Sequence, residues 1–165
     1  MQILTEIGSL FYMIIFTMGL FIKKRTRRLG LILILSILAG TIVSAYIKES
    51  VGQERPNLDF KGRPFPIPLE KDTFSFFGAD TNSFPSGHAT RTSAFGLVIG
   101  IALSKRFPKG CYLLFIYPLL VSVSRVYVLQ HYPTDVICGI ILGVLVSGII
   151  SKKLKLHLIF EKSET

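Results

Sequence analysis

Five long stretches without a charged residue constrain this chain more than any other feature. They cover residues 7–22, 29–47, 92–104, 111–124 and 136–151. Inside a bilayer every backbone N–H and C=O must be paired within the protein, which favours helices as spanning segments. Half of the 165 residues (50%) are hydrophobic, and the mean hydropathy is +0.53. We therefore predict an all-α, polytopic membrane bundle with about five transmembrane helices.

Some of these runs are shorter than the roughly 20 residues that a ~30 Å hydrocarbon core requires, so their helices are expected to extend into flanking polar residues. The third helix should begin near Ser86, and the fourth should reach Val128. These extensions place His88, Arg91 and Arg125 in the outer ends of helices. Ionisable side chains at such depths usually have a function.

The first run has an alternative interpretation as a cleaved secretory signal. Glu6 lies just before it, a basic cluster follows it, and no Ala-x-Ala cleavage site is present. These features favour a retained membrane anchor.

The net charge of +9 is distributed unevenly. Five threaded helices place residues 23–28, 105–109 and the tail after Ser151 on one face. That face holds twelve of the nineteen Lys and Arg residues and two acids, giving +10, whereas the remainder holds seven basic and eight acidic residues, giving −1. Basic loops mark the cytoplasmic side, so we predict a cytoplasmic C-terminus in the inner or plasma membrane. The distribution indicates contact with anionic lipid heads and no nucleic-acid partner.

The tetrapeptide Pro85-Ser86-Gly87-His88 directly precedes the third span and predicts a loop-to-helix junction. Ser86 is a natural N-cap, and Gly87 lets a ligand approach the backbone closely. Unpaired N–H groups and the helix dipole at such a start favour an anion such as phosphate. His88 would lie in the first turn, within reach of a departing oxygen. The alternative is a simple helix start with an interfacial histidine.

His131 and Asp135 are four residues apart, a spacing that lets two side chains meet on one helical face. Pro133 fits the first turn of the fifth helix. A carboxylate held against one imidazole nitrogen fixes the tautomer and leaves the other nitrogen as a nucleophile. The alternative is a capped helix start with a surface ion pair.

Lys48, Arg55 and Arg125 are expected at the outer ends of spans or in the adjoining loop. Guanidinium forks match phosphate oxygens and lysine adds a compact charge, so together they would neutralise a phosphoryl group during transfer. Individually each is compatible with a snorkelling interfacial side chain. The topology, argued from other residues, places all three clusters at the outward face, which favours one shared site.

The three clusters read Lys48-x6-Arg55-Pro56, Pro85-Ser86-Gly87-His88 and Ser124-Arg125-x5-His131-x3-Asp135. In this order they resemble the signature of the type 2 phosphatidic acid phosphatases, a family of integral-membrane lipid phosphatases, and every signature position is filled. The resemblance covers residues 48–135 of a single predicted membrane domain, 1–165. It implies a phosphoric ester hydrolase built as a helical bundle, commonly of six spans against the five predicted here.

The resemblance also implies roles for individual residues. His131 would form a phosphohistidine, Asp135 would orient it, and His88 would protonate the leaving group. The phosphate would be held by Lys48, Arg55, Ser86, Gly87 and Arg125. Arg91, one turn beyond His88, is our candidate for an additional contact with the substrate head group. No metal or other cofactor is implied, and zinc bridging the two histidines would occupy both nucleophile and acid.

The expected partner is a phosphorylated membrane lipid. Candidates are undecaprenyl diphosphate, lipid A 1-phosphate, phosphatidylglycerol phosphate and phosphatidate, and a site facing the periplasm or exterior favours the first two. Two alternatives stay open. The first is an enzyme like the vanadium haloperoxidases, which share the signature, and the second is a non-catalytic protein that binds or transports phospholipids.

The segment 48–85 is expected to form an outer loop rich in Pro and Phe. Its six phenylalanines would be costly in water, so the loop is expected either to fold onto the bundle or to line the entrance for an acyl or prenyl chain. Small residues at Gly139, Gly143 and Ser147 line one face of the fifth helix, which suits packing within the bundle or a homo-oligomer. Cys111 and Cys138 are expected at different depths, unsuited to a disulfide.

Overall fold

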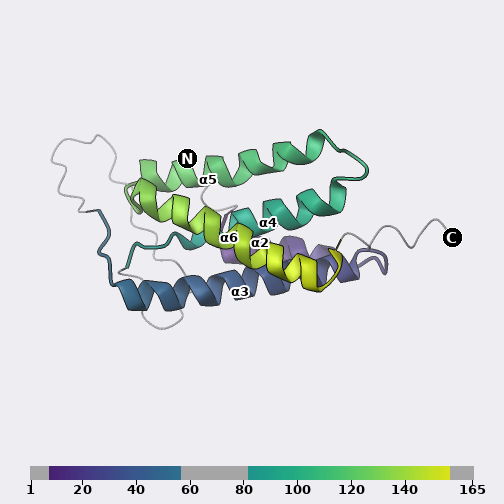
Figure 1. Cartoon of the computed structure of the whole chain (residues 1–165), viewed down its shortest axis with the longest axis horizontal. Helices are drawn as coiled ribbons and strands as arrows, with labels where there is room; N and C mark the ends of the chain where they lie inside the picture. Colours follow the sequence, from purple (N-terminus) through teal and green to yellow (C-terminus); the bar gives the residue numbers. More distant parts are fainter. Residues whose placement is uncertain (1–7, 57–81, 157–165) are drawn as a thin grey trace.

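The computed structural model describes residues 8–56 and 82–156, and most of these residues are helical (Figure 1). The elements are α2 (Leu10–Gly19), α3 (Arg27–Val51), α4 (Gly87–Leu103), the 3-10 helix η2 (Gly110–Phe115), α5 (Ile116–Tyr127) and α6 (Pro133–Lys153). Within the described ranges the single extended pairing is an isolated bridge between Glu54 and Asn82. The prediction of an all-α fold is confirmed.

Three helical stretches of the described chain are long and apolar enough to cross a membrane. They are α3, the continuous stretch Gly110–Tyr127, and α6. The helix α2 is shorter, with 10 residues, and α4 has 17 residues and carries His88 and Arg91 near its start. The fold is therefore a helical membrane bundle, whereas the count of five spans stays a prediction.

The helix α6 has one face that contacts the bundle and one that is exposed. Large apolar side chains on the exposed face recur every fourth residue and are 53–57% exposed; they are Ile137, Ile141, Leu145 and Ile149. On the other face Gly139, Gly143 and Ser147 are buried. Gly139 lies so close to α4 that a Cβ there would be 2.6 Å from the Ser86 carbonyl oxygen. The small-residue stripe thus serves packing within the bundle.

This close packing predicts that Gly143→Ala destabilises the protein. A Cβ at Gly143 would collide with the Thr90 backbone carbonyl and lie 3.0 Å from Ser93 Cβ. We expect a loss of about 1–3 kcal/mol, seen as a lower midpoint of thermal unfolding in detergent. Gly148→Ala is the matched control, because its nearest contact is an ordinary 3.7 Å to Leu97. Since alanine favours helices, the control should be neutral or stabilising. Equal destabilisation of both variants would contradict the close packing of Gly143 against α4.

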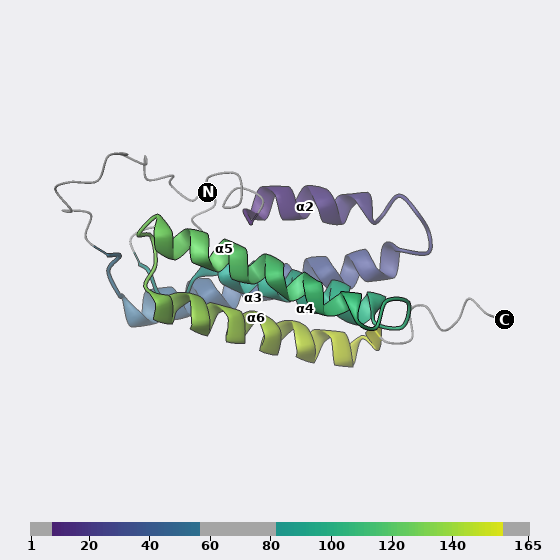
Figure 2. The same cartoon turned by 90° about the horizontal axis from the view of Figure 1, so that it is seen from above.

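The helix α4 lies at the centre of the bundle and contacts α3, η2, α5 and α6, as two perpendicular views show (Figures 1 and 2). Its Ala89, Ala94 and Val98 are fully buried. The helix α2 packs against α3, and its Phe16 stacks edge-on against Phe95 of α4 with 5.2 Å between the ring centroids. The helix α4 is therefore surrounded by other helices.

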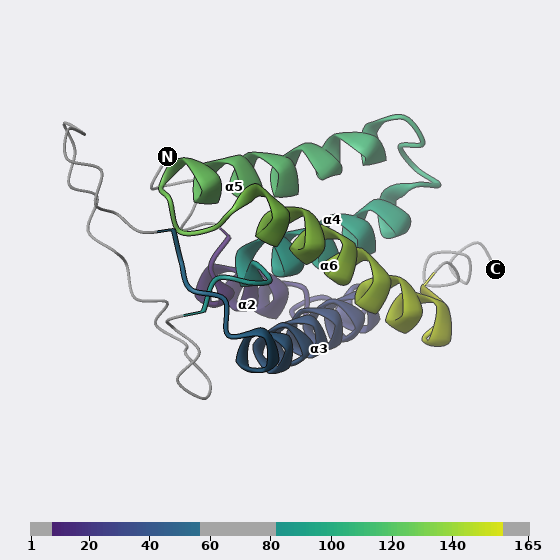
Figure 3. The ribbon, with the colours of Figure 1, turned by 60° about the vertical axis from the view of Figure 1, so that its left-hand side comes forward.

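Four helix ends meet on one side of the bundle (Figure 3). The C-terminal ends of α3 and α5 point to this side, as do the N-terminal ends of α4 and α6. All three sequence clusters lie on these ends or in the segments that connect them. The chain therefore brings the described residues of the three clusters together at one end, as the topology argument predicted.

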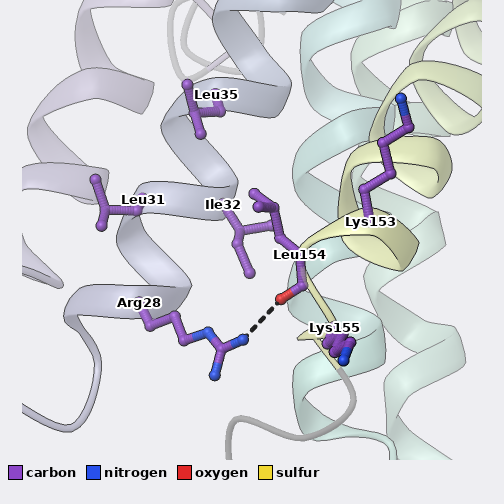
Figure 4. A pocket seen from close by; sticks show the side chains of 7 residues that line it. All are labelled: Arg28, Leu31, Ile32, Leu35, Lys153, Leu154 and Lys155. Atoms are coloured by element: carbon purple, nitrogen blue, oxygen red, sulfur yellow. Dashed lines mark hydrogen bonds between the residues drawn. The ribbon is translucent and has the colours of Figure 1, made fainter.

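A cavity of about 370 Å³ lies at the opposite end, between the start of α3 and the end of α6 (Figure 4). It is lined by Leu31, Ile32, Leu35 and Leu154 and by the basic side chains of Arg28, Lys153 and Lys155. Arg28 Nη2 donates a hydrogen bond to the Leu154 carbonyl at 2.9 Å. Because α3 rises about 1.5 Å per residue, this end is about 30 Å from Lys48. The cavity is separate from the histidine cluster.

Candidate active site

The predicted site residues come from different helix ends but share one buried region. Lys48 lies in the last turn of α3, Ser86 caps α4, and Arg125 lies in the last turn of α5. His131 is in the connection between α5 and α6, and Asp135 is in the first turn of α6. The exposed fractions of Arg125, His131 and Asp135 are 1%, 2% and 0%, and His88 is 2% exposed. Arg55 and Gly87 are half-buried.

The two imidazoles lie within the electrostatic reach of the same cations. The charges of Arg125 and Lys48 act on both His88 and His131. Arg55 also acts on His131, whereas Arg91 acts on His88. His131 acts on His88 as well. Two neutral bases surrounded by several cations form a site suited to an anion with multiple charges.

Ser86 is the N-cap of α4, as the sequence predicts. Its backbone is extended, its Oγ accepts a hydrogen bond from Ala89 N at 3.5 Å, and its carbonyl accepts from Thr90 N at 3.0 Å. Its own N–H donates to the Asp135 carbonyl at 2.9 Å, which ties the start of α4 to the first turn of α6. The N-terminal N–H groups of α4 are therefore held at the site, where an anion is favoured.

The imidazole of His131 has a nearer partner than the carboxylate that the sequence suggested. Its Nδ1 lies 2.8 Å from the Ser83 carbonyl and 3.6 Å from Asp135 Oδ2. The carboxylate accepts a closer hydrogen bond from Tyr132 N at 2.9 Å and a longer one from Gln53 Nε2 at 3.4 Å. Because both neighbours of Nδ1 are acceptors, Nδ1 carries the proton and Nε2 has the free lone pair. The orienting role of Asp135 stays a prediction. The Ser83 carbonyl is a second acceptor for Nδ1, which the sequence did not predict.

His131 is neutral at physiological pH. Its burial lowers the pKa to about 4, and the charges of Arg125, Lys48 and Arg55 act in the same direction. The interaction of Nδ1–H with the Asp135 carboxylate raises the pKa but is outweighed by burial. A neutral imidazole has the lone pair that a nucleophile needs.

This pKa predicts that the protein loses stability as the pH falls from about 6.5 to 4. In that window an exposed histidine of the unfolded chain binds a proton and the buried His131 does not, so protonation favours unfolding. The difference of about 2.5 pH units corresponds to about 3 kcal/mol once the pH is below 4. The measurement is the free energy of unfolding in detergent at pH 7 and pH 4. A His131→Gln variant should lose less stability than the wild type, and an equal loss would contradict the low pKa.

The end of α3 and the segment before α4 are joined by a set of hydrogen bonds that sequence reasoning missed. Lys48 Nζ donates to the Asn82 carbonyl at 3.3 Å, and Asn82 Nδ2 donates to the Lys48 carbonyl at 3.0 Å. Ser83 N donates to the Gln53 carbonyl at 2.7 Å. The same segment thus holds the Lys48 side chain and presents the Ser83 carbonyl to His131. One available signal was Gly52, whose left-handed backbone (φ 62°) ends α3 just after Lys48.

Arg91 lies beside His88 on α4. Its Nη2 is 3.3 Å from His88 Nδ1, and the side chain is 9% exposed. The predicted contact of Arg91 with a substrate head group stays a prediction. Most of the predicted Phe-rich outer loop, residues 57–81, lies outside the described residues. Cys111 and Cys138 are both free thiols, and the described residues contain no group of three or more His, Cys, Asp or Glu side chains that could hold a metal ion.

The fold and the site together define a helical membrane protein with a buried cluster of histidines and cations at one end of the bundle. The model of the PAP2 superfamily matches residues 29–157, and the chain belongs to this family. It is 34% identical to an undecaprenyl-diphosphatase of Sulfolobus acidocaldarius, over 87% of this chain and 64% of that protein. It is 30% identical to a decaprenylphosphoryl-5-phosphoribose phosphatase of Mycobacterium tuberculosis, over 84% and 69%. The chain thus spans about two thirds of the length of these relatives.

Two solved structures have the same fold. A transmembrane PAP2-type phosphatidylglycerolphosphate phosphatase from Bacillus subtilis has a TM-score of 0.70 and 26% identity, covering 92% of this chain and 73% of that one. Aquifex aeolicus LpxE has a TM-score of 0.69 and 23% identity, covering 92% and 82%.

Proposed function

We propose that the protein is a metal-independent lipid phosphatase that hydrolyses a phosphomonoester or diphosphate on a membrane lipid head group. The observation that carries this proposal is that two buried imidazoles share the field of Arg125 and Lys48. Relatives of this chain are named as phosphatases of lipids, including an undecaprenyl-diphosphatase and a lipid A 1-phosphatase. Candidate substrates are undecaprenyl diphosphate, lipid A 1-phosphate, phosphatidylglycerol phosphate and phosphatidate.

The proposed mechanism begins with the phosphoryl group held by Lys48, Arg55 and Arg125 and by the first N–H groups of α4. Nε2 of His131 attacks phosphorus, the P–N bond forms, and the bond from phosphorus to the leaving oxygen breaks. The Ser83 carbonyl and Asp135 face Nδ1–H and stabilise the positive ring. His88 donates a hydrogen bond or proton to the leaving oxygen. Water then attacks phosphorus, and phosphate is released as the P–N bond breaks.

The proposed orientation places this site on the periplasmic or outer side of the membrane. Basic residues at the other end of the bundle, such as Arg28, Lys105 and Lys152, support a cytoplasmic position for that end and for the C-terminus. A substrate would then enter from the outer leaflet. The exposed apolar side chains of α3 and α6 are suited to contact lipid next to the site.

The experiment that tests the function is release of inorganic phosphate from a panel of the four candidate lipids in mixed micelles containing EDTA. We expect release from at least one lipid, unchanged by EDTA and inhibited by vanadate. Binding of a lipid without phosphate release would indicate a transport or binding protein. Vanadate-dependent oxidation of halide would indicate a haloperoxidase. Either result would overturn the proposal.

A further inference from the structure

The two histidines of the site face partners of opposite hydrogen-bonding character. Nδ1 of His131 faces two acceptors, the Ser83 carbonyl and the Asp135 carboxylate. Nδ1 of His88 faces a donor, because Arg91 Nη2 lies 3.3 Å away. Arg91 and His88 are three residues apart on α4, a spacing that places them on one face of the helix. The same ring atom is therefore in opposite environments in the two residues.

A guanidinium group has five N–H donors and no acceptor. In its contact with Arg91, Nδ1 of His88 must therefore accept the hydrogen bond, and the ring proton must be on Nε2. A doubly protonated ring would place an N–H against the N–H of Arg91. The other charged or titratable groups acting on His88 are Arg125 from α5, Lys48 from α3 and His131 from the α5–α6 connection. Burial of the ring is the largest effect that opposes its protonation, and all of these groups act in the same direction. On α6, Asp135 lies beside His131.

We propose that Arg91 is a positioning residue that holds His88 as the neutral Nε2–H tautomer, and that the site consequently prefers substrates whose leaving group departs without taking a proton. This inference rests on the proposed phosphatase function. A neutral Nε2–H stabilises a leaving anion by a hydrogen bond but is a poor proton donor. Lipid diphosphates satisfy this requirement because their leaving group is a phosphate, with a second pKa near ~6. Lipid monophosphates do not, since they would release an alkoxide.

The step balances without an additional acid. Nε2 of His131 forms the bond to the terminal phosphorus, the bridging P–O bond breaks, and its electron pair stays on the departing lipid monophosphate. Nε2–H of His88 donates a hydrogen bond to that oxygen and keeps its proton. Water then forms a P–O bond, and the P–N pair returns to His131. The dihydrogen phosphate so formed loses its excess proton to solvent.

The test uses two substrates with the same lipid, undecaprenyl diphosphate and undecaprenyl phosphate, in the same micelles. For the wild type we expect kcat/KM to be at least about 100-fold higher for the diphosphate, because the missing general acid is worth roughly 10²–10⁴-fold. A ratio near one would overturn the proposal. This arm needs no variant. Absence of phosphate release from every lipid phosphate would instead contradict the proposed function itself.

The variant arm compares Arg91→Gln with Arg106→Gln, an exposed arginine on the connection between α4 and η2. In Arg91→Gln His88 loses one of the groups that oppose its protonation and the donor that fixes its tautomer, so the diphosphate preference should fall by about tenfold or more. Monophosphate hydrolysis should rise toward acidic pH relative to the wild type, because one of the charges that keep the His88 ring neutral has been removed. Arg106→Gln should change neither quantity. An unchanged pH profile with equal losses on both substrates, or a rise in KM alone, would show a structural or head-group role for Arg91 and refute the positioning role.

Discussion

Replacing His131 with alanine is expected to lower phosphate release from lipid substrates by about 10⁴-fold or more. Loss of a covalent nucleophile has effects of this order, because the covalent intermediate through which the reaction proceeds can then no longer form. His131 is 2% exposed, and its Nδ1 is held by the Ser83 carbonyl at 2.8 Å, so Nε2 is the atom left for attack. The measurement is single-turnover phosphate release, with acid-labile phosphoprotein as the second readout. Wild type should form the labelled intermediate, and His131→Ala should not.

The control for this prediction is His157→Ala. His157 is the third histidine of the chain; it belongs to none of the three motifs and lies outside the described residues. This variant should keep wild-type turnover. Thermal unfolding of both variants in detergent separates a loss of chemistry from a loss of structure. Full turnover by a folded His131→Ala protein would exclude a phosphohistidine on this residue.

The gathering of the three motifs at one end of the bundle was predictable from the sequence. The distribution of basic residues gave the topology, and the positions of the motifs along the chain then placed all three on the same face. The start of α4 at Gly87 follows from the Ser-Gly pair after Pro85, although the uncharged run begins only at Thr92. The polar residues between are buried inside the bundle, where His88 and Thr90 contact protein instead of lipid. Helix packing was predictable as well, since Gly139 and Gly143 recur on one face of α6.

The hydrogen-bond partners of the predicted catalytic side chains were less predictable. Every residue has a backbone carbonyl, so no sequence pattern marks the one at Ser83 as the acceptor for His131. The reciprocal pair of Lys48 and Asn82 joins residues 34 positions apart, and neither position signals the other. Arg91 was identified from its position one turn after His88, but the direction of its guanidinium depends on packing. The first apolar run was predicted over residues 7–22, whereas α2 ends at Gly19, a poor helix former.

Arg125→Lys is expected to lower kcat/KM by about 10²–10³-fold. Arg125 is 1% exposed and its charge acts on both His88 and His131, so the guanidinium is within electrostatic reach of both imidazoles. Lysine keeps the charge but lacks the planar fork that binds two phosphate oxygens at once. Removal of one preorganised donor from a charge-stabilising site has an effect of this size. Phosphate release and the inhibition constant for vanadate are the two measurements, and both should change.

The vanadate measurement distinguishes a loss of phosphoryl binding from a general loss of structure. Weaker inhibition by vanadate in parallel with the lower kcat/KM is expected if Arg125 holds the phosphoryl group in the transition state. Arg106→Lys provides the control, because Arg106 is exposed and lies 5.8 Å from the Phe107 ring, away from the helix ends that form the site. That variant should stay within about twofold of wild type, as surface substitutions usually do. Wild-type kcat/KM in Arg125→Lys would show that charge alone suffices and that no bidentate contact is made.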